Sequence, residues 1–520
     1  MDFIANHLLT LILFLPALGA LVMLFLPGEP KGLHRWTALI TSLLTLVLAL
    51  VVWMQFDRGA AGFQFQEQYA WYEAINASFH VGVDGLGLTM VLLTTLLSPL
   101  AILASFSIQD KVKAYMMLFL FLETGMLGVF MALDLLIFFV FYEIGLVPMF
   151  FLIQQWGNPK GERELWGGMK VPSRVYASFK FMVYTMGASL GLLLAIQLMG
   201  VSVGSYDLPK LFKMWPILQR TDTVPLGLSF STAKAIAFWA MTIAFALKVP
   251  VWPFHTWLPD AHTEAPTAGS MILAGVLLKM GAYGFLRFIL PLYPAEAKHF
   301  AAWLAFLAVM AIIFGAFGAY GQDDFKRLVA YSSINHMGFV ILGIAAAAKA
   351  IGTADATIAL NGAVLQMFNH GLSAAGMFFL VGVIYERAHT RDLNEFGGLF
   401  PLLPVYGGIL IFTSMAALGL PGLNGFVSEF LVVRGSWPIF TAYTAVAMLG
   451  LLFTGSYVLK GIKKVLHGPL NEKWVGHLTE INARELLVIT PLMVLMLELG
   501  VWPAWLLDVI NRAMSMFFGA

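Results

Sequence analysis

The feature that most constrains this chain is a series of fourteen long apolar stretches joined by short polar connections. A helix that crosses a membrane needs about 20 mostly apolar residues, and each stretch can supply one. Only 11% of the 520 residues are charged, far fewer than the roughly 25% of a typical soluble protein. We therefore predict an all-α polytopic membrane protein. The stretches lie at about 3–26, 34–56, 83–106, 113–132, 134–156, 174–199, 233–257, 267–290, 300–320, 325–347, 358–385, 403–434, 440–465 and 484–507.

The composition also excludes several classes of protein. The net charge is +1 and no long basic run is present, which argues against a nucleic-acid-binding protein. The chain has no cysteine, so it cannot form disulfides or hold zinc or iron–sulfur clusters through thiolates. We predict that the chain carries neither a cofactor nor a metal. If it takes part in redox chemistry, the electrons travel on another subunit.

The distribution of basic residues predicts an orientation. The odd-numbered connections hold about twice as many Lys and Arg residues as the even-numbered ones, and basic loops face the cytoplasm. Both termini are then expected on the opposite, periplasmic side. The first stretch ends in Leu26-Pro27-Gly28 and lacks a small-residue cleavage site, so we predict a retained helix. The two longest connections, 57–80 and 201–230, are too short to bury cores of their own.

Ionisable residues inside a span cost about 2.5–3.5 kcal/mol each on insertion scales, so each one is a candidate functional group. Four are remote from any span end or lie at a break: Glu143, Lys248, Lys279 and Glu429. Further candidates are His336, His370, Glu123 and Lys234. The histidines could instead be satisfied core residues, Glu123 a structural partner of a neighbouring helix, and Lys234 a snorkelling side chain, as we expect for Lys180. Together these groups predict a series of proton-exchanging sites along the membrane interior.

Two spans contain breaks. Pro250 and Pro253 interrupt the seventh span directly after Lys248, because each proline removes a backbone donor. The apolar helix 235–247 before this break is too short to cross alone, so a second half-helix should complete the crossing. The segment 419–425 interrupts the twelfth span one turn before Glu429. Irregular backbone at membrane depth is tolerated where it is buried or lines a cavity.

The two breaks lie five spans apart, which predicts two inverted five-helix repeats. Spans four to eight (113–290) would form the first repeat and spans nine to thirteen (300–465) the second, each with one broken helix. Three N-terminal spans (1–112) and a C-terminal span (484–520) would complete one polytopic domain.

Several motifs resemble a known family. The segment 245–262, FALKVPVWPFHTWLPDAH, is similar to a signature of the antiporter-like membrane subunits of respiratory complex I, which are in turn similar to the large subunits of multi-subunit Na+/H+ antiporters. Further matches are LLK at 277–279, AYSSINHMG at 330–338 and NHGLSAA at 369–375. The resemblance covers nearly the whole chain. Two sibling members are expected to have Lys at the position of Glu429, so the resemblance favours a third member with a carboxylate there.

The resemblance implies roles for the buried charges. Glu143 would pair with Lys248 and control its proton affinity. Lys279 would connect to His336 and His370 along a hydrated axis, and Glu429 would be the terminal proton site. The protein would be a proton-translocating subunit of an NADH–quinone oxidoreductase in a bacterial inner membrane. Flavin and iron–sulfur clusters would lie on partner subunits, and two sibling antiporter-like chains would be among its membrane neighbours.

Three alternative functions use the same residues. A subunit of a multi-subunit Na+/H+ antiporter would need the same Lys and Glu set, and only its partners would distinguish it. A haem protein ligated by His336 and His370 would absorb visible light. A secondary transporter for a small solute would need a substrate pocket, and the charges alone do not suggest one.

Overall fold

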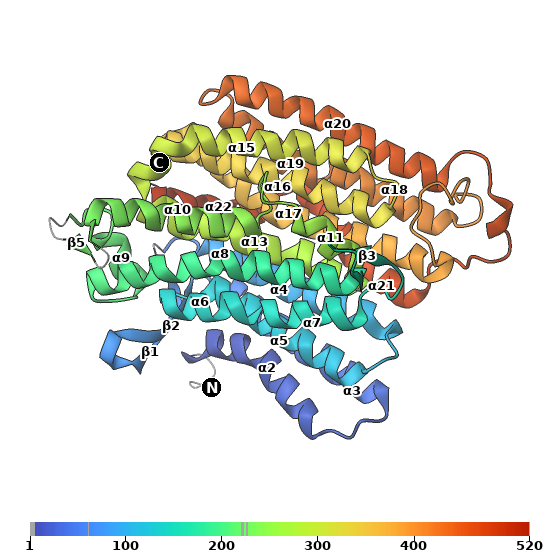
Figure 1. The fold of residues 1–520 in the computed structure, drawn as a ribbon, viewed down its shortest axis with the longest axis horizontal. Helices are drawn as coiled ribbons and strands as arrows, with labels where there is room; N and C mark the ends of the chain where they lie inside the picture. Colours follow the sequence, from blue (N-terminus) through green and yellow to red (C-terminus); the bar gives the residue numbers. More distant parts are fainter. Residues whose placement is uncertain (1–5, 61, 166, 220–222, 225–226, 519–520) are drawn as a thin grey trace.

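A computed structural model describes residues 6–60, 62–165, 167–219, 223–224 and 227–518 of the chain. The start of the predicted stretch 3–26 and the end of the predicted segment 484–520 lie outside these residues. Within the described part, the chain is a bundle of helices whose axes run roughly side by side (Figure 1). The prediction of an all-α polytopic membrane protein is confirmed, with small hairpins added at the ends of the bundle.

Twelve helices of the described chain are long and apolar enough to cross a membrane. They are α2 (Leu8–Phe25), α3 (Lys31–Gln55), α4 with the 3-10 turn η2 (Gly85–Ser107), α5 (Val112–Met131), α6 with α7 (Leu135–Trp156), α8 (Ser173–Val203), α10 (Phe230–Lys248), α12 to α14 with their intervening segments (Thr267–Leu292), α15 (Pro294–Tyr320), α16 (Phe325–Lys349), α17 (Ala354–Ala388) and α20 (Thr441–Leu466). Helix α4 itself covers Gly85–Ala104, α6 covers Leu135–Ile144 and α7 covers Leu146–Trp156.

The two remaining predicted stretches are interrupted. Helices α18 (Pro404–Leu418) and α19 (Asn424–Ser436) flank the predicted break at 419–425. Helices α21 (Ala483–Val501) and α22 (Ala504–Phe518) form a pair bent by 70°. These two pairs and the twelve helices account for all fourteen predicted stretches.

The seventh span does end at the prolines after Lys248, but the prediction that the helix before them is too short to cross alone is wrong, because α10 is long enough to be a span by itself. Helix α10 has 19 residues because it begins at Phe230, where the Ser229 hydroxyl accepts a hydrogen bond from the Thr232 backbone N–H. The chain then turns through the proline segment into α11 (Trp257–Glu264). Ser229, the residue that caps α10, lies in the polar segment 201–230, which hydropathy alone assigns to the connection before the span.

The eighth span is not a uniform helix. Two π-helical segments, η3 (Leu273–Leu277) and η4 (Phe285–Ile289), alternate with α12 (Thr267–Ile272), α13 (Leu278–Gly284) and α14 (Leu290–Leu292). Such π segments shift backbone carbonyls out of the regular ladder and are frequent at functional sites. Lys279 lies two residues after the end of the first of them.

Three small hairpins and three short helices occupy the ends of the bundle. The pairs are β1 (Gln64–Tyr72) with β2 (Ala77–Val83), β3 (Glu162–Glu164) with β4 (Lys170–Pro172), and β5 (Thr223–Val224) with β6 (Leu228–Ser229), all antiparallel. The short helices are η1 (Glu73–Ile75), α9 (Leu208–Met214) and η5 (Glu472–Trp474). Hairpin β1–β2 and β5 lie at one end of the bundle with α9, and β3 lies at the other (Figure 1).

Aspartate side chains begin several helices. The carboxylates of Asp84, Asp134, Asp207 and Asp324 each accept a backbone N–H from the first turn of α4, α6, α9 and α16, respectively. A carboxylate at this position satisfies an orphan donor and complements the positive end of the helix dipole. Aspartates between the apolar stretches therefore fix where these four helices start.

The most enclosed elements lie in the middle of the bundle. The apolar windows of the α12–α14 span and of α17 are entirely buried, whereas α8, α15 and α20 expose large apolar side chains such as Leu194, Trp303 and Leu452. Exposed apolar side chains on the outer helices are expected for a protein whose outer surface contacts lipid. The ionisable residues discussed next are on the enclosed elements.

Candidate functional site

The centre of the bundle holds a lysine in contact with a histidine. Lys279 is 0% exposed, and its Nζ lies 2.6 Å from Nδ1 of His370 on α17. The same Nζ donates to the Ala274 carbonyl at 2.5 Å. Ala274 belongs to the π-helical segment η3, so the irregular turn supplies the carbonyl that holds the ammonium group.

A second pair continues from this one. His336 on α16 and Glu429 on α19 are both buried, and His336 Nδ1 lies 2.8 Å from Glu429 Oε1. The rings of His336 and His370 are 5.6 Å apart, centroid to centroid. Four predicted residues from α13, α17, α16 and α19 therefore form one series: Lys279, His370, His336 and Glu429.

The break in the twelfth span positions the last member of this series. Gly419 ends α18 with a φ of +83°, a conformation that favours glycine. A Cβ added at Gly419 would lie 3.3 Å from Glu429 Oε2, so the second carboxylate oxygen faces the backbone of the break. The Pro/Gly segment thus both interrupts the span and leaves room for the carboxylate.

Uncharged polar residues complete the surroundings of Glu429 and His336. The Gln366 side-chain amide donates to Glu429 Oε1 at 3.0 Å, and the Tyr457 hydroxyl lies 3.2 Å from His336 Nε2. Ser428 donates to Gln366 Oε1 at 2.5 Å. Gln366, Tyr457 and Ser428 were not predicted, because the cost of charge inside a span singles out only acidic residues, basic residues and histidines. The spacing of Gln366 and His370, one helical turn apart on α17, was an available signal.

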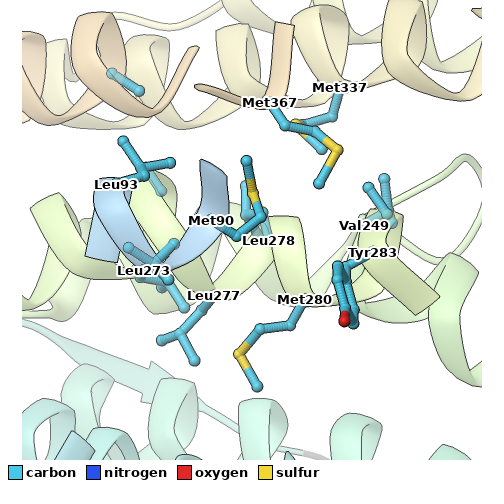
Figure 2. Close-up of a cluster of buried hydrophobic side chains, with 14 of the residues drawn as sticks. Met90, Leu93, Val249, Leu273, Leu277, Leu278, Met280, Tyr283, Met337 and Met367 are labelled. Atoms are coloured by element: carbon cyan, nitrogen blue, oxygen red, sulfur yellow. The ribbon is translucent and has the colours of Figure 1, made fainter. Parts of the chain in front are cut away.

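Apolar side chains enclose the series. Leu278 and Met280 flank Lys279, Met337 follows His336, and Met367 lies one turn before His370 along α17. Figure 2 shows these side chains with Met90 of α4 in one packed cluster. All are buried, so the polar pairs sit in an apolar surrounding where unpaired charge is costly.

The first break brings Lys248 to Tyr142 and not directly to Glu143. Lys248 is buried, its Nζ lies 3.6 Å from the Tyr142 ring centroid, and it donates to the Tyr142 carbonyl at 3.4 Å. Glu143 and Lys248 interact electrostatically, yet no ion pair within 4.0 Å joins these two described residues. One carboxylate oxygen of Glu143 is buried without a hydrogen-bond partner in the described part of the chain. Glu143 and Lys248 therefore interact electrostatically without forming a direct ion pair.

Helix α10 and α13 approach each other closely at Lys248. A Cβ added at Gly281 would lie 2.7 Å from the Phe245 carbonyl oxygen and 2.8 Å from the Val249 backbone nitrogen. Only glycine allows this approach, which packs the end of α10 against the helix that carries Lys279. The two groups of ionisable residues are therefore on elements in direct contact.

The structure places the other two predicted residues apart from this series. Glu123 on α5 is fully buried, with Ser42 of α3 and Ser98 of α4 as polar neighbours. Lys234 lies near the start of α10 and donates to the Trp215 and Pro216 carbonyls at 3.0 and 3.2 Å. Lys180, which we expect to snorkel to the interface, contacts the Asp260 carboxylate at 2.7 Å.

One more buried histidine lies in the signature segment. His262 on α11 is buried, its ring stacks on Phe378 at 4.4 Å, and neither ring nitrogen has a hydrogen-bond partner among the described residues. The sequence analysis quoted this residue only as part of the signature. Its position next to a helix end gave no signal that its ring would be buried.

The chemistry of the arrangement is proton exchange. Each member of the series can hold or release a proton, and each neighbouring pair can share one through a hydrogen bond or a bridging water. Within the described residues, no group of three or more His, Cys, Asp or Glu side chains is arranged to hold a metal ion. The site offers hydrogen-bond partners and no set of metal ligands.

Comparisons with known proteins agree with this chemistry. The family model described as NADH:quinone oxidoreductase/Mrp antiporter, TM, matches residues 132–454. NADH-quinone oxidoreductase subunit M of Rickettsia conorii is 36% identical over 514 residues, covering 98% of each chain. The protein of the same name from Rhodobacter capsulatus is 38% identical over 517 residues, covering 98% of this chain and 96% of its own.

Solved structures give the same fold. A chain of respiratory complex I from Thermus thermophilus with bound NADH superimposes with a TM-score of 0.83 at 25% identity, covering 98% of this chain and all of that one. A chain of the Mrp complex from Dietzia sp. DQ12-45-1b gives a TM-score of 0.82 at 18% identity, covering 99% and 98%, which shows a shared fold alone. The resemblance noted in the motifs is confirmed. The chain belongs to the NADH:quinone oxidoreductase/Mrp antiporter transmembrane family, and within it to the relatives called subunit M of NADH-quinone oxidoreductase.

Proposed function

We propose that this chain is the proton-translocating, antiporter-like membrane subunit of an NADH-quinone oxidoreductase. The observation that carries the proposal is the series of buried groups Lys279, His370, His336 and Glu429, with 2.6 Å and 2.8 Å contacts inside its two pairs. The relatives at 36–38% identity over nearly the full length support the assignment to this enzyme. The chain belongs to a proton-pumping translocase and carries no redox chemistry itself.

Protons move along the series by transfer between neighbours. Lys279 and His370 exchange a proton through their direct contact, and His336 and Glu429 do the same. A bridging water or ring rotation joins the two imidazoles, since His370 Nε2 has no hydrogen-bond partner among the described residues and both nitrogens of His336 are paired with Glu429 and Tyr457. Glu429 is the terminal site, because its second oxygen faces the backbone of the interrupted span.

Glu143 and Lys248 act as the gate of the first unit. In the structure the Lys248 ammonium group contacts the ring and the carbonyl of Tyr142 and makes no direct contact with the Glu143 carboxylate. We take this arrangement as the open state of the pair, and a direct Lys248–Glu143 ion pair as the closed state. Closing the pair stabilises the charged lysine, and opening it favours release of the proton. Glu123 and Lys234 are assigned supporting roles in proton transfer, since both are ionisable groups of the same unit.

The two inverted units are 113–290, which contains the break after Lys248, and 300–465, which contains the break at 419–425. Residues 1–112 and 484–520 are the N-terminal and C-terminal additions to them. The redox reaction takes place on partner subunits that hold flavin and iron–sulfur clusters. Two sibling antiporter-like chains are among the membrane neighbours, and both termini face the periplasm in a bacterial inner membrane.

The test is proton pumping by the purified complex in sealed vesicles, with a pH-sensitive dye and NADH plus quinone as the driving reaction. Lys279→Met should abolish dye response per quinone reduced, whereas Lys349→Met, at the exposed end of α16, should leave it unchanged. Co-purification with flavin and iron–sulfur subunits is expected. Isolation with small antiporter subunits alone, together with a dye response that needs a Na+ gradient, would instead identify a Na+/H+ antiporter.

A further inference from the structure

A basic cavity lies at one end of the bundle, away from the proton series. It has a volume of about 790 Å³ and is bordered by the ends of α15 and α20 and by the segment 393–397. Four basic side chains line it, namely Lys460, Lys463, Lys464 and His467. No carboxylate is among its described lining residues. The proton-transfer proposal uses none of these residues.

Most of the positive charge in this cavity is not neutralised. Lys460 donates to the Tyr320 and Gln322 carbonyls at 2.7 and 2.8 Å and lies 3.5 Å from a carboxylate oxygen of Asp323, whose side chain is 60% exposed. Lys464 donates to the amide oxygen of Asn394 at 2.5 Å. The side chain of Lys463 has no hydrogen bond or ion pair to any described residue.

The face of α20 that leads from this cavity is apolar. Leu452, Ser456, Leu459 and Lys463 follow one another at helical spacing, so they lie on one side of α20, and His467 directly follows the helix. Leu452 and Leu459 are 68% and 55% exposed. The exposed face therefore changes from apolar at membrane depth to basic at its end.

Helix α15 extends this apolar face. Its Phe317 ring is 4.6 Å from the Phe453 ring of α20, and Phe317 and Tyr320 are about half exposed. Tyr320 lines the basic cavity as well. An aromatic residue at the boundary between an apolar strip and a polar headgroup region is typical of a membrane interface.

We propose that this cavity binds the headgroup of an anionic phospholipid, whose acyl chains lie along the exposed face of α20 and α15. The phosphate would accept hydrogen bonds from the ammonium groups of Lys463 and Lys464, and Lys460 would add a third positive charge nearby. A helix C-terminus alone attracts one or two basic residues, but it does not require a cavity or an apolar strip in register with them. Basic pockets between transmembrane helices recognise lipid phosphates in this way.

The charge of the cavity selects among lipids. A zwitterionic headgroup brings its own ammonium group into a space that already holds four basic side chains, which costs electrostatic free energy. A soluble phosphate ester would gain the same contacts at the phosphate but none along Leu452 and Leu459. The site is therefore expected to prefer an anionic lipid to both.

The experiment uses membrane vesicles that contain the full tagged chain in its native surroundings. Phosphatidylglycerol or phosphatidylcholine with a photoreactive diazirine in the acyl chain is added, illuminated, and located by mass spectrometry of the peptides that span 449–469. We expect phosphatidylglycerol to label this segment clearly more than phosphatidylcholine. Lys463→Gln should reduce that labelling about fivefold, because one lysine near a lipid phosphate contributes about 1 kcal/mol, and Lys463→Arg should keep it.

Lys473→Gln is the matched control, because Lys473 pairs with Glu395 at 2.9 Å and does not line the cavity. It should not change the labelling. Equal labelling by both lipids, or labelling that Lys463→Gln leaves intact, would overturn the proposal. Loss of labelling in the presence of millimolar glycerol phosphate would assign the cavity to a soluble phosphate ester, and absence of any labelling would mean that protein covers this face.

Discussion

The imidazole of His336 lies 2.8 Å from the carboxylate of Glu429, and both side chains are buried. This contact joins α16 to the half-helix that follows the break in the twelfth span. Removing one member of a buried hydrogen-bonded pair leaves the other without its partner, which costs more than the pair itself contributes. Substitutions at Glu429 must therefore be judged by both assembly and proton transfer.

Glu429→Ala should abolish proton release while Glu429→Lys should retain part of it. The lysine remains titratable, and Gln366 can turn its amide oxygen toward the new ammonium group. Glu429→Gln keeps the shape and a hydrogen-bond acceptor for His336 but cannot ionise, so it should assemble well and still fail to release protons. Dye-monitored release on the outer side of reconstituted vesicles measures all three. If the Ala variant releases protons as well as the Lys variant does, Glu429 has a structural role only.

Lys279 and His370 should behave as one unit. Lys279→Met is expected to lower the pumping rate about 100-fold or more, which is the usual loss when an enzyme is deprived of a residue that transfers a proton. Because the two side chains are 2.6 Å apart, adding His370→Gln to Lys279→Met should cause little further loss. Initial rates of the two single variants and the double variant decide this. Independent, multiplicative losses would show that the two residues do not share a route.

The sequence predicted the members of the series, and the family resemblance implied that Lys279 connects to the two histidines, but the direct contacts Lys279–His370 and His336–Glu429 were not predicted. Lys279, His336, His370 and Glu429 stood out because ionisable groups are costly inside apolar spans. Which of them touch depends on how α13, α16, α17 and α19 pack, and contacts between residues about 90 positions apart leave no trace in periodicity. Gln366 and Tyr457 were missed because uncharged polar residues are common in membrane helices.

The extramembrane hairpin was also missed, although its signal was present. Residues 64–72 alternate polar and aromatic side chains over part of their length, which is typical of a strand. Within it, Glu67 is buried and accepts the backbone N–H groups of Leu9 and Thr10 at the start of α2. A search restricted to long apolar stretches assigns such a segment to a connection.

The gate makes a prediction about Lys248. Lys248→Met should abolish pumping, and Lys248→Arg should pump poorly, because a guanidinium remains protonated and cannot pass its proton on. Glu143→Gln should impair pumping while the complex remains assembled. Pumping per quinone reduced, measured beside the amount of assembled complex, separates the two effects. Near-normal pumping by the Arg variant would mean that positive charge alone is required at this position.

The last prediction concerns stability and involves a pair outside the proton series. Arg287 Nη2 lies 2.5 Å from Asp84 Oδ1, with side chains that are 2% and 4% exposed. Asp84 also accepts the Gly87 backbone N–H at 2.9 Å and so begins α4. Asp84→Ala removes the helix cap and the carboxylate partner of a buried guanidinium. We expect it to lower the free energy of unfolding by about 3–5 kcal/mol.

Asp84→Asn should be milder, because its amide oxygen can still accept from both Arg287 and Gly87. The exposed pair Arg434–Asp355, with side chains 54% and 36% exposed, is the matched control. Asp355→Ala should cost at most about 1 kcal/mol, since water and salt screen such a pair. Thermal unfolding in detergent, followed by tryptophan emission at low and high salt, compares them. Since a buried pair is little affected by salt, the loss in Asp84→Ala should be the same at both salt concentrations. A loss as small as that of Asp355→Ala would show that the Asp84–Arg287 contact does not hold α4 to the eighth span.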